Sequence, residues 1–155
     1  MATRLQREIK QTKPFASPGE EALLNVMRTA AVLEHTLAEA LKPYGVTPTQ
    51  YNALRILRGA GAEGLCRNEI RDRMIKSVPD ATRLLDRLEQ AGLAKRRRSD
   101  ADRRYVTACI TNKGLDLLDQ IDGPLNEMFE AMLGHLSRSD LRTLSELLGR
   151  ARERC

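Results

Sequence analysis

Aromatic side chains are scarce in this 155-residue chain, where they make up 3% of the residues, and tryptophan is absent. With charged residues at 30%, this composition is typical of a soluble helical protein rather than a secreted or membrane one. Apolar runs are only a few residues long, and the opening segment, MATRLQREIKQTK, has no hydrophobic stretch. We therefore expect neither an export signal nor contact with a membrane.

Cysteine and histidine are also few. The three cysteines, Cys66, Cys109 and Cys155, are odd in number and far apart, so a disulfide framework is excluded and a reducing cytoplasm is expected. The two histidines, His35 and His135, are isolated, whereas structural zinc needs four clustered ligands. We expect no metal and no cofactor.

Catalytic motifs are missing as well. The chain has no nucleophile elbow, no P-loop and no dinucleotide-binding glycine motif. Its carboxylates mostly alternate with lysine or arginine, as they do on solvated helix surfaces. We therefore expect a protein that is not an enzyme.

The basic charge, in contrast, is concentrated in one part of the chain. Residues 67–104 contain twelve Lys or Arg and seven Asp or Glu, a net charge of +5, which equals the net charge of the whole chain. The remaining residues balance, with fourteen of each sign. A localised basic unit of this kind is typical of a surface that binds nucleic-acid phosphates.

A helix is predicted over residues 79–91 inside this unit. Its apolar residues recur at i, i+3, i+4, i+7 and i+10, which gives one apolar face. Ser77 is suited to cap the start, Pro79 to occupy the first turn, and Gly92 to follow the end. The opposite face carries Arg83 and Arg87 one turn apart.

A hairpin with a basic tip follows this helix. Residues 93–98 contain the run KRRR, residues 105–110 alternate apolar and polar side chains, and the sequence SDADRR between them has the composition of a turn. A helix followed by such a hairpin is the pattern of a winged helix. The helix would lie in a DNA major groove while the hairpin reaches toward the minor groove.

The rest of the chain predicts helices on both sides of this unit. The expected fold class is mostly α with a small β-hairpin (α+β), a winged helix-turn-helix flanked by dimerisation helices. A short helix over 65–75 forms the first half of the helix-turn-helix. Overall we expect one compact domain, in which four segments follow one another: a polar arm (1–19), a dimerisation helix (20–46), the winged unit (47–111) and C-terminal dimerisation helices (112–155).

The motifs of the winged unit closely resemble the MarR family of bacterial and archaeal transcription regulators. The resemblance rests on DATRLLDRLEQAGL, then KRRR, then DRRYVTACITNKG, and extends upstream through TPTQYNALRILRGAGAEGL. Asp102, Arg104 and Thr111 match in order the family's Asp-x-Arg element and the threonine that leads into a long helix. The resemblance implies a homodimeric DNA-binding transcription regulator that acts in the cytoplasm, associated with the nucleoid when bound, and commonly as a repressor.

Duplex DNA is therefore the expected partner. Two recognition helices related by a two-fold axis would read an inverted repeat, with half-sites about one duplex turn apart. In the recognition helix and the turn before it, the expected contact residues are Lys76, Ser77, Pro79, Asp80, Thr82, Arg83 and Arg87. In the wing, they are Arg97, Arg98, Asp102, Arg103 and Arg104.

A small-molecule effector is also implied by the resemblance, and an aromatic compound is one candidate. The residues that could line its pocket mix apolar walls with two polar handles, and packing in the core is the alternative role for them. They are Met27, Ala31, His35, Tyr51 and Met74.

Three alternatives stay open at this point. A winged helix can bind another protein instead of DNA. Cys66, at a helix start beside Arg67, could act as a redox sensor, although an inert thiol is favoured. The polar arm could be a frayed terminus, or it could contact a partner subunit or DNA through its basic residues, Arg4, Arg7, Lys10 and Lys13.

Overall fold

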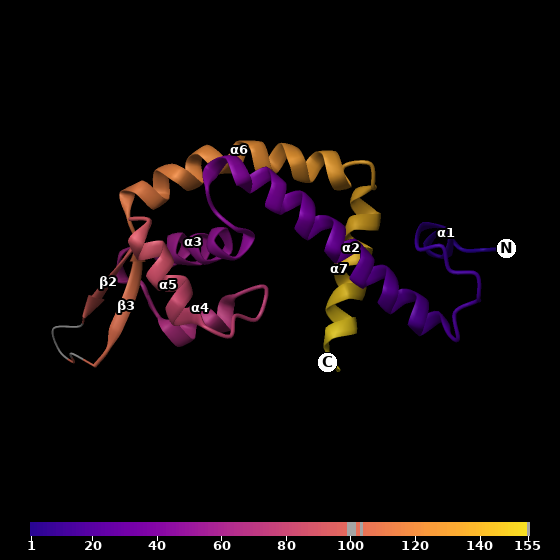
Figure 1. Cartoon of the computed structure of the whole chain (residues 1–155), viewed down its shortest axis with the longest axis horizontal. Helices are drawn as coiled ribbons and strands as arrows, with labels where there is room; N and C mark the ends of the chain where they lie inside the picture. Colours follow the sequence, from indigo (N-terminus) through magenta and orange to yellow (C-terminus); the bar gives the residue numbers. More distant parts are fainter. Residues whose placement is uncertain (99–101, 103, 155) are drawn as a thin grey trace. The chain divides into compact units, whose positions relative to one another are not determined.

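The computed structural model describes residues 1–98, 102 and 104–154 of the chain. These residues form two units, residues 1–48 and 49–155 (Figure 1). The helical elements of the first unit are α1 (Arg4–Glu8), α2 (Pro18–Leu41) and η1 (Lys42–Tyr44). The helical elements that follow are α3 (Pro48–Ala60), η2 (Gly61–Glu63), α4 (Arg67–Arg73), α5 (Ala81–Gln90), α6 (Asn112–Leu133) and α7 (Arg138–Arg152).

The N-terminal arm is folded. Thr3 caps α1, and the buried side chain of Gln6 donates to the carbonyl of Lys13 at 2.9 Å while it accepts from the amide of Thr3 at 2.8 Å. These bonds close the arm into a loop around the buried side chain of Leu5. A frayed arm is therefore wrong, and contact of the arm with a partner subunit or DNA stays a prediction.

The long helix α2 begins two residues earlier than predicted, because Ser17 caps it and Pro18 occupies its first position. The hydroxyl of Ser17 accepts from the amide of Glu20 at 3.1 Å. Leu41 is its buried residue, while several large apolar side chains are exposed. These are Leu23, Val26, Met27 and Val32.

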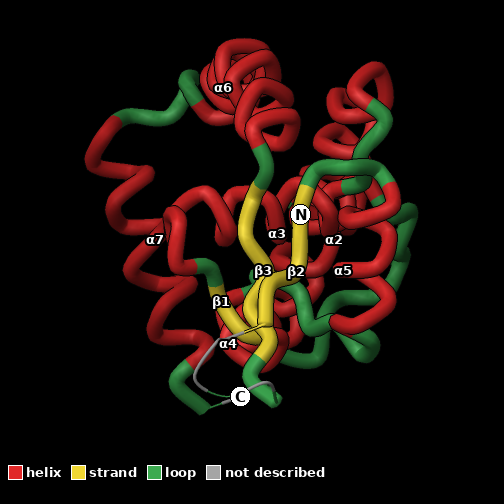
Figure 2. Tube along the Cα trace, turned by 90° about the vertical axis from the view of Figure 1, so that its left-hand side faces the viewer, coloured by secondary structure: helices red, strands yellow, loops and turns green. Residues whose placement is uncertain are grey.

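A three-stranded antiparallel sheet forms the wing of the second unit (Figure 2). The predicted hairpin is confirmed as β2 (Ala94–Arg98) and β3 (Val106–Ile110), with Arg96 opposite Ala108. A third strand, β1 (Leu65–Cys66), pairs with the other edge of β3. The predicted helix over 65–75 is therefore too long, because its first two residues join the sheet and α4 begins at Arg67.

Glycine permits the close approach of β1 to β3. Gly64 has a φ of +72°, and a Cβ at this position would collide with the carbonyl of Ala108. Gly92, also at a φ of +72°, follows α5 as predicted and turns the chain into β2.

The core of the winged unit is formed by buried side chains of α3, α4, α5 and α6, together with Leu65 and Ala108 of the sheet. The apolar stripes of the amphipathic helices pack against one another here. An ion pair attaches α6 to α3, since Arg58 Nη1 lies 2.7 Å from Asp122 Oδ2. This hydrogen bond raises the pKa of Arg58. The residues at the centre are Leu54, Leu57, Ile70, Leu85, Leu88 and Leu118.

Side-chain hydroxyl groups cap the last two helices. Thr111 accepts from the amide of Gly114 at 3.1 Å and donates to the carbonyl of Gly92 at 2.6 Å, so the cap of α6 is also attached to the end of α5. Ser137 caps α7 together with Asp140. Helix α7 has no buried residue, and it exposes Leu144 and Leu147.

None of the helices within residues 1–98, 102 and 104–154 is long and apolar enough to cross a bilayer. No group of three or more His, Cys, Asp or Glu in this part of the chain is placed to hold a metal ion.

Candidate nucleic-acid interface

The recognition helix α5 begins later than the sequence predicted. Its N-cap is Asp80, whose carboxylate accepts from the amide of Arg83 at 2.9 Å. Ser77 and Pro79 therefore precede the helix, and the prediction that they occupy its cap and first turn is wrong. A proline disfavours helical geometry in the residue before it, so the side chain at position 80 is the next that can cap the helix.

The turn before α5 is attached to α3. The side chain of Asn52 accepts from the amide of Ile75 at 2.9 Å, which fixes the chain between α4 and the cap. Lys76, Ser77 and Pro79 are exposed there. These three predicted contact residues consequently lie on the turn rather than on the helix.

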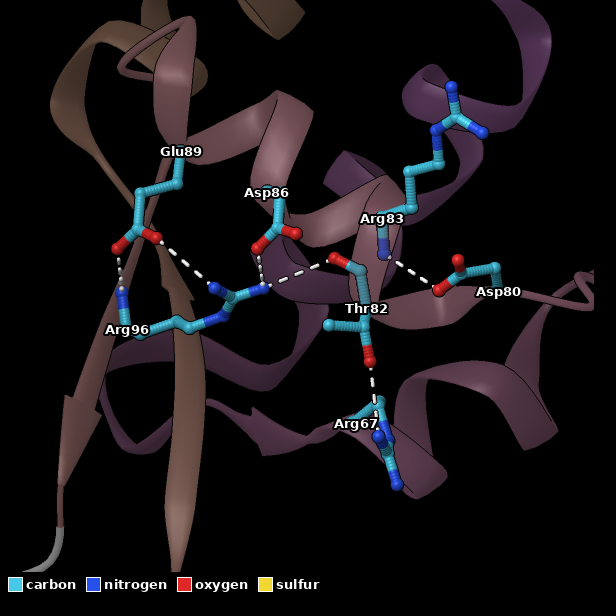
Figure 3. A network of polar contacts seen from close by, with 7 residues as sticks. All are labelled: Arg67, Asp80, Thr82, Arg83, Asp86, Glu89 and Arg96. Carbon is cyan, nitrogen blue, oxygen red and sulfur yellow. Dashed lines mark hydrogen bonds and ion pairs between the residues drawn. The ribbon is translucent and has the colours of Figure 1, made fainter.

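The surface of α5 divides into three stripes. Ala81, Leu84, Leu85 and Leu88 are buried. Arg83 and Arg87, one turn apart, are exposed on the stripe that continues from the turn, and the guanidinium of Arg83 points away from the neighbouring carboxylates (Figure 3). A third stripe, at i, i+4 and i+7, carries Thr82, Asp86 and Glu89 and faces the wing.

This third stripe is joined to β2 by Arg96 (Figure 3). Its Nη2 lies 2.6 Å from Asp86 Oδ1 and donates to the carbonyl of Thr82 at 3.2 Å. Its Nη1 donates to Glu89 Oε2 at 3.3 Å, and its main-chain amide donates to the other carboxylate oxygen at 3.2 Å. The side chain of Arg96 is 29% exposed.

Arg97, the next residue of β2, lies on the opposite face of the sheet from Arg96, because side chains alternate across a strand. Arg97 donates to the carbonyl of Ala62 at 3.1 Å, on the side of η2. Arg97 and Arg98 are both exposed. The KRRR run is therefore spread over both faces of the sheet.

Asp102 is bonded to the residues that lead into β3. Its carboxylate accepts from the main-chain amide of Arg104 at 2.9 Å, and its carbonyl accepts from the amide of Tyr105 at 2.9 Å. The side chain of Arg104 is exposed and lines the groove described next. Arg103, also predicted to contact DNA, lies outside the described residues.

A groove of about 520 Å³ lies between α4, α5 and the wing. Three arginines line it, Arg67, Arg96 and Arg104, together with Asn68, Thr82 and Tyr105. Arg67 donates to the hydroxyl of Thr82 at 3.0 Å, which links α4 to α5. Arg96 is paired with the carboxylates of α5, so the guanidinium groups of Arg67 and Arg104 are the ones that favour phosphate in this open groove.

Tyr105 adds a hydroxyl donor to the groove. The main-chain amide of Cys66 donates to Glu69 at 2.8 Å, which holds the pKa of this carboxyl below its usual value. The negative charge of Glu69 in turn raises the pKa of Tyr105. Like an ordinary tyrosine, this phenol is protonated at neutral pH and can donate a hydrogen bond to an anion.

The five residues predicted for an effector pocket fall in both units. Met27, Ala31 and His35 belong to α2 and are exposed. Tyr51 is buried in α3, which raises the pKa of its hydroxyl, and Met74 is half-buried at the end of α4. A ligand site formed by these residues stays a prediction.

Comparison with known proteins decides the family. A model described as "MarR family" matches residues 44–104. The HTH-type transcriptional regulator MhqR of Bacillus subtilis (strain 168) is 32% identical over 107 residues, which span 69% of this chain and 72% of the relative. The chain belongs to the MarR family.

Other members of the MarR family extend the similarity. The transcriptional repressor MprA of Escherichia coli (strain K12) is 28% identical over 84% of this chain and 75% of its own length. A MarR transcription factor from Planctomyces limnophilus is 36% identical, with a TM-score of 0.67 over 88% of this chain and 98% of that one. The DNA complex of Staphylococcus aureus MepR has a TM-score of 0.75 over 84% and 96% of the two chains at 20% identity, a likeness of fold.

Membership in the MarR family confirms several expectations from the sequence. The fold is a mostly helical winged helix-turn-helix with a small antiparallel sheet, and the protein is a transcription regulator rather than an enzyme. The individual contact residues remain predictions of this geometry.

Sequence reasoning missed Arg67 and Arg96. The sequence places Arg96 in the basic run but does not pair it with Asp86 and Glu89. The spacing contained the signal, because Thr82, Asp86 and Glu89 share one side of the helix and Arg96 is the middle residue of a strand that follows it. Arg67 was used only as the neighbour of Cys66, since the sequence does not show that α4 crosses α5 at Thr82.

Proposed function

We propose that this MarR-family regulator reads duplex DNA with α5 in the major groove and the wing along the adjacent minor groove. One observation carries the proposal: Arg83 and Arg87 are exposed on α5, and the guanidinium groups of Arg67 and Arg104 line the groove beside them. The first pair suits base edges, and the groove suits the phosphates between the two grooves of DNA. The contact residues predicted in the turn and in the wing complete this surface.

The DNA-binding form is proposed to be a homodimer. Apolar side chains are exposed on α2 in the first unit and on α6 and α7 in the second, among them Leu23, Met27, Phe129, Leu144 and Leu147. Exposed apolar surface of this kind favours association with a second copy. Residues 20–46 and 112–155 are accordingly assigned to dimerisation, and residues 47–111 to DNA binding.

Two-fold symmetry of the dimer would match an inverted repeat. The half-sites should lie about 10 base pairs apart, centre to centre, since each recognition helix enters the major groove on the same side of the duplex. Repression is the proposed effect, because a dimer on a promoter repeat blocks the polymerase, and the relative MprA is a transcriptional repressor.

Release by a small molecule completes the proposal. The residues proposed to bind the effector are those predicted from the sequence. A ligand that binds more tightly to an arrangement of the dimer that does not fit DNA would lower the affinity for DNA. The compartment is the cytoplasm of a bacterium or archaeon, and the regulator is associated with the nucleoid while it is bound.

Selection from a random duplex library tests this function. The full chain should enrich sequences with an inverted repeat of the stated spacing, and a competition with scrambled duplex should show a preference that persists at physiological salt. Absence of any enriched sequence, with a correctly folded protein, would contradict the proposal.

Contact with another protein is the competing function. A winged helix used in this way gives an affinity that depends little on salt, whereas phosphate contacts release a run of counterions. The arginine-lined groove favours DNA over this alternative. A titration of duplex at several salt concentrations separates the two.

A further inference from the structure

The charge of the recognition helix presents a problem for DNA binding. With its cap, α5 carries three carboxylates, those of Asp80, Asp86 and Glu89, against the two guanidinium groups of Arg83 and Arg87. Its own charge is therefore negative, and a negative helix is repelled by the phosphates on both sides of a major groove. Something outside the helix must offset the carboxylates.

Arg96 supplies this offset from the wing. One guanidinium group contacts the carboxylates of both Asp86 and Glu89, at 2.6 Å and 3.3 Å, as well as the carbonyl of Thr82 (Figure 3). The main-chain amide of Arg96 adds a second bond to Glu89. The same four contacts attach β2 to α5 at Thr82, Asp86 and Glu89, over about two turns of the helix.

We propose that Arg96 is a positioning residue for DNA reading, which acts through Asp86 and Glu89. It holds the wing at a fixed distance from the recognition helix and neutralises the two carboxylates, so that DNA meets Arg83 and Arg87 on a surface of positive charge. This inference rests on the proposed function.

A direct contact of Arg96 with DNA fits the geometry less well. Both of its terminal nitrogens already donate to α5, and the side chain is 29% exposed, whereas its neighbours Lys95 and Arg97 are exposed. Breaking these bonds to reach a phosphate would leave two carboxylates unpaired beside the DNA.

Arginine is required for this role, because one planar guanidinium can bridge two acceptors and a carbonyl at once. A lysine ammonium is a compact charge that can pair closely with one carboxylate only. The contact of Arg67 with the hydroxyl of Thr82 extends the same attachment to α4, so both elements beside α5 are anchored at one residue.

The test is a double-mutant cycle in DNA affinity. The variants are R96A, the pair D86N/E89Q, and all three changes together, with K95A as a control for the loss of one positive charge from the same strand. Each full-length protein is titrated against the selected operator and against scrambled duplex. Thermal unfolding of each variant confirms that binding is measured on folded protein.

R96A should weaken operator binding about tenfold, more than K95A, within the range of coupling found for residues that share one network. In the D86N/E89Q background, R96A should reduce operator affinity no more than K95A reduces it in the wild type, because no carboxylate is left to neutralise. The logarithm of the operator affinity of R96K should lie between the values for R96A and the wild type. If R96A does not fold, R96K in the two backgrounds gives the same comparison.

If R96A reduced operator affinity equally in the wild type and in D86N/E89Q, Arg96 would contact DNA itself. If it reduced the affinity in neither, other contacts would hold the wing. Both results overturn the inference while leaving the proposed function intact. A wild-type protein that fails to bind duplex DNA would instead contradict the proposed function.

Discussion

Arg83 lies on the recognition helix and Arg104 at the end of the wing turn, and different groups hold their main chains. The amide of Arg83 is bonded to the cap of α5, and its side chain extends from the helix into solvent. The amide of Arg104 is bonded to Asp102 in the turn of the wing. A side chain on the helix can reach base edges, whereas one on the wing can insert into a minor groove, which favours arginine without specifying a base.

Replacing these two arginines should therefore have different consequences. R83A should cost on the order of 1–3 kcal/mol per half-site and relax discrimination at one base position. R104A should weaken binding to operator and scrambled duplex by similar factors and flatten the salt dependence by about one counterion per subunit. Titrations of both duplexes measure these effects, with R154A as a charge-matched control beyond the end of α7. Operator binding that survived both changes would place DNA on another surface.

The cysteines should contribute little to regulation. Cys109 is buried and its thiol donates to the carbonyl of Ala62 at 3.4 Å, while Cys66 caps α4 beside Glu69. Cys155 lies outside the described residues. Serine at all three positions should leave DNA affinity and its response to peroxide unchanged, apart from a loss of stability at position 109. A peroxide-induced release that disappeared in C66S would establish the redox-sensing alternative.

At the scale of elements, the start of α5 depends on one side chain. Asp80 caps the helix and also supplies one of the carboxylates close to DNA, so its two roles must be separated. D80A should lower the free energy of unfolding by about 0.5–2 kcal/mol, because the amide of Arg83 loses its acceptor. D80N keeps an acceptor and should lose much less stability.

Chemical denaturation of D80A and D80N measures this difference, and the slope of unfolding free energy against denaturant should stay the same in both. Because the amide of asparagine is neutral, D80N should also bind DNA at least as tightly as the wild type. Equal stability of D80A and the wild type would mean that another group caps α5.

Most elements could be predicted from the sequence, because their signals are local. Ser137, Thr111 and Gly92 mark helix ends by their own chemistry, and the alternation in residues 106–110 is enough to predict a strand. The short strand β1 could not be predicted, since two residues carry no periodicity and their pairing with β3 is a tertiary contact. The same reason explains the missed contacts of Arg96, because its acceptors are on another element.

The start of α5 shows a different kind of limit. Ser77, Pro79 and Asp80 are each reasonable near a helix start, and composition alone does not choose among them. Which of these residues caps the helix depends on the path of the preceding turn. A hydrogen bond from the amide of Ile75 to the side chain of Asn52 in α3 holds this path. A sequence pattern therefore predicts that a helix is present more reliably than it predicts the residue at which the helix begins.

At the scale of the whole molecule, association should depend on apolar side chains that one chain leaves exposed. Helix α7 offers the cleanest test, because none of its residues is buried, so changes there should spare the core. L144E/L147E should produce a folded monomer, since two carboxylates cannot be buried unpaired in an interface. R142E introduces a carboxylate on the other side of the same helix and serves as the control.

Sedimentation at micromolar concentration distinguishes the two states. The wild type and R142E should be dimers, and L144E/L147E should be monomeric and bind the inverted repeat far more weakly than a dimer does. A stable wild-type monomer would rule out reading of an inverted repeat by two related helices.

The salt dependence of duplex binding by the wild-type protein shows whether phosphates of DNA contact this surface. A dimer with two recognition helices and two wings should contact several phosphates, so its affinity for the operator should fall by on the order of a thousandfold or more between about 50 and 200 mM salt. The logarithm of the affinity should change linearly with the logarithm of the salt concentration. An affinity that stayed constant over this range would contradict DNA binding through this surface.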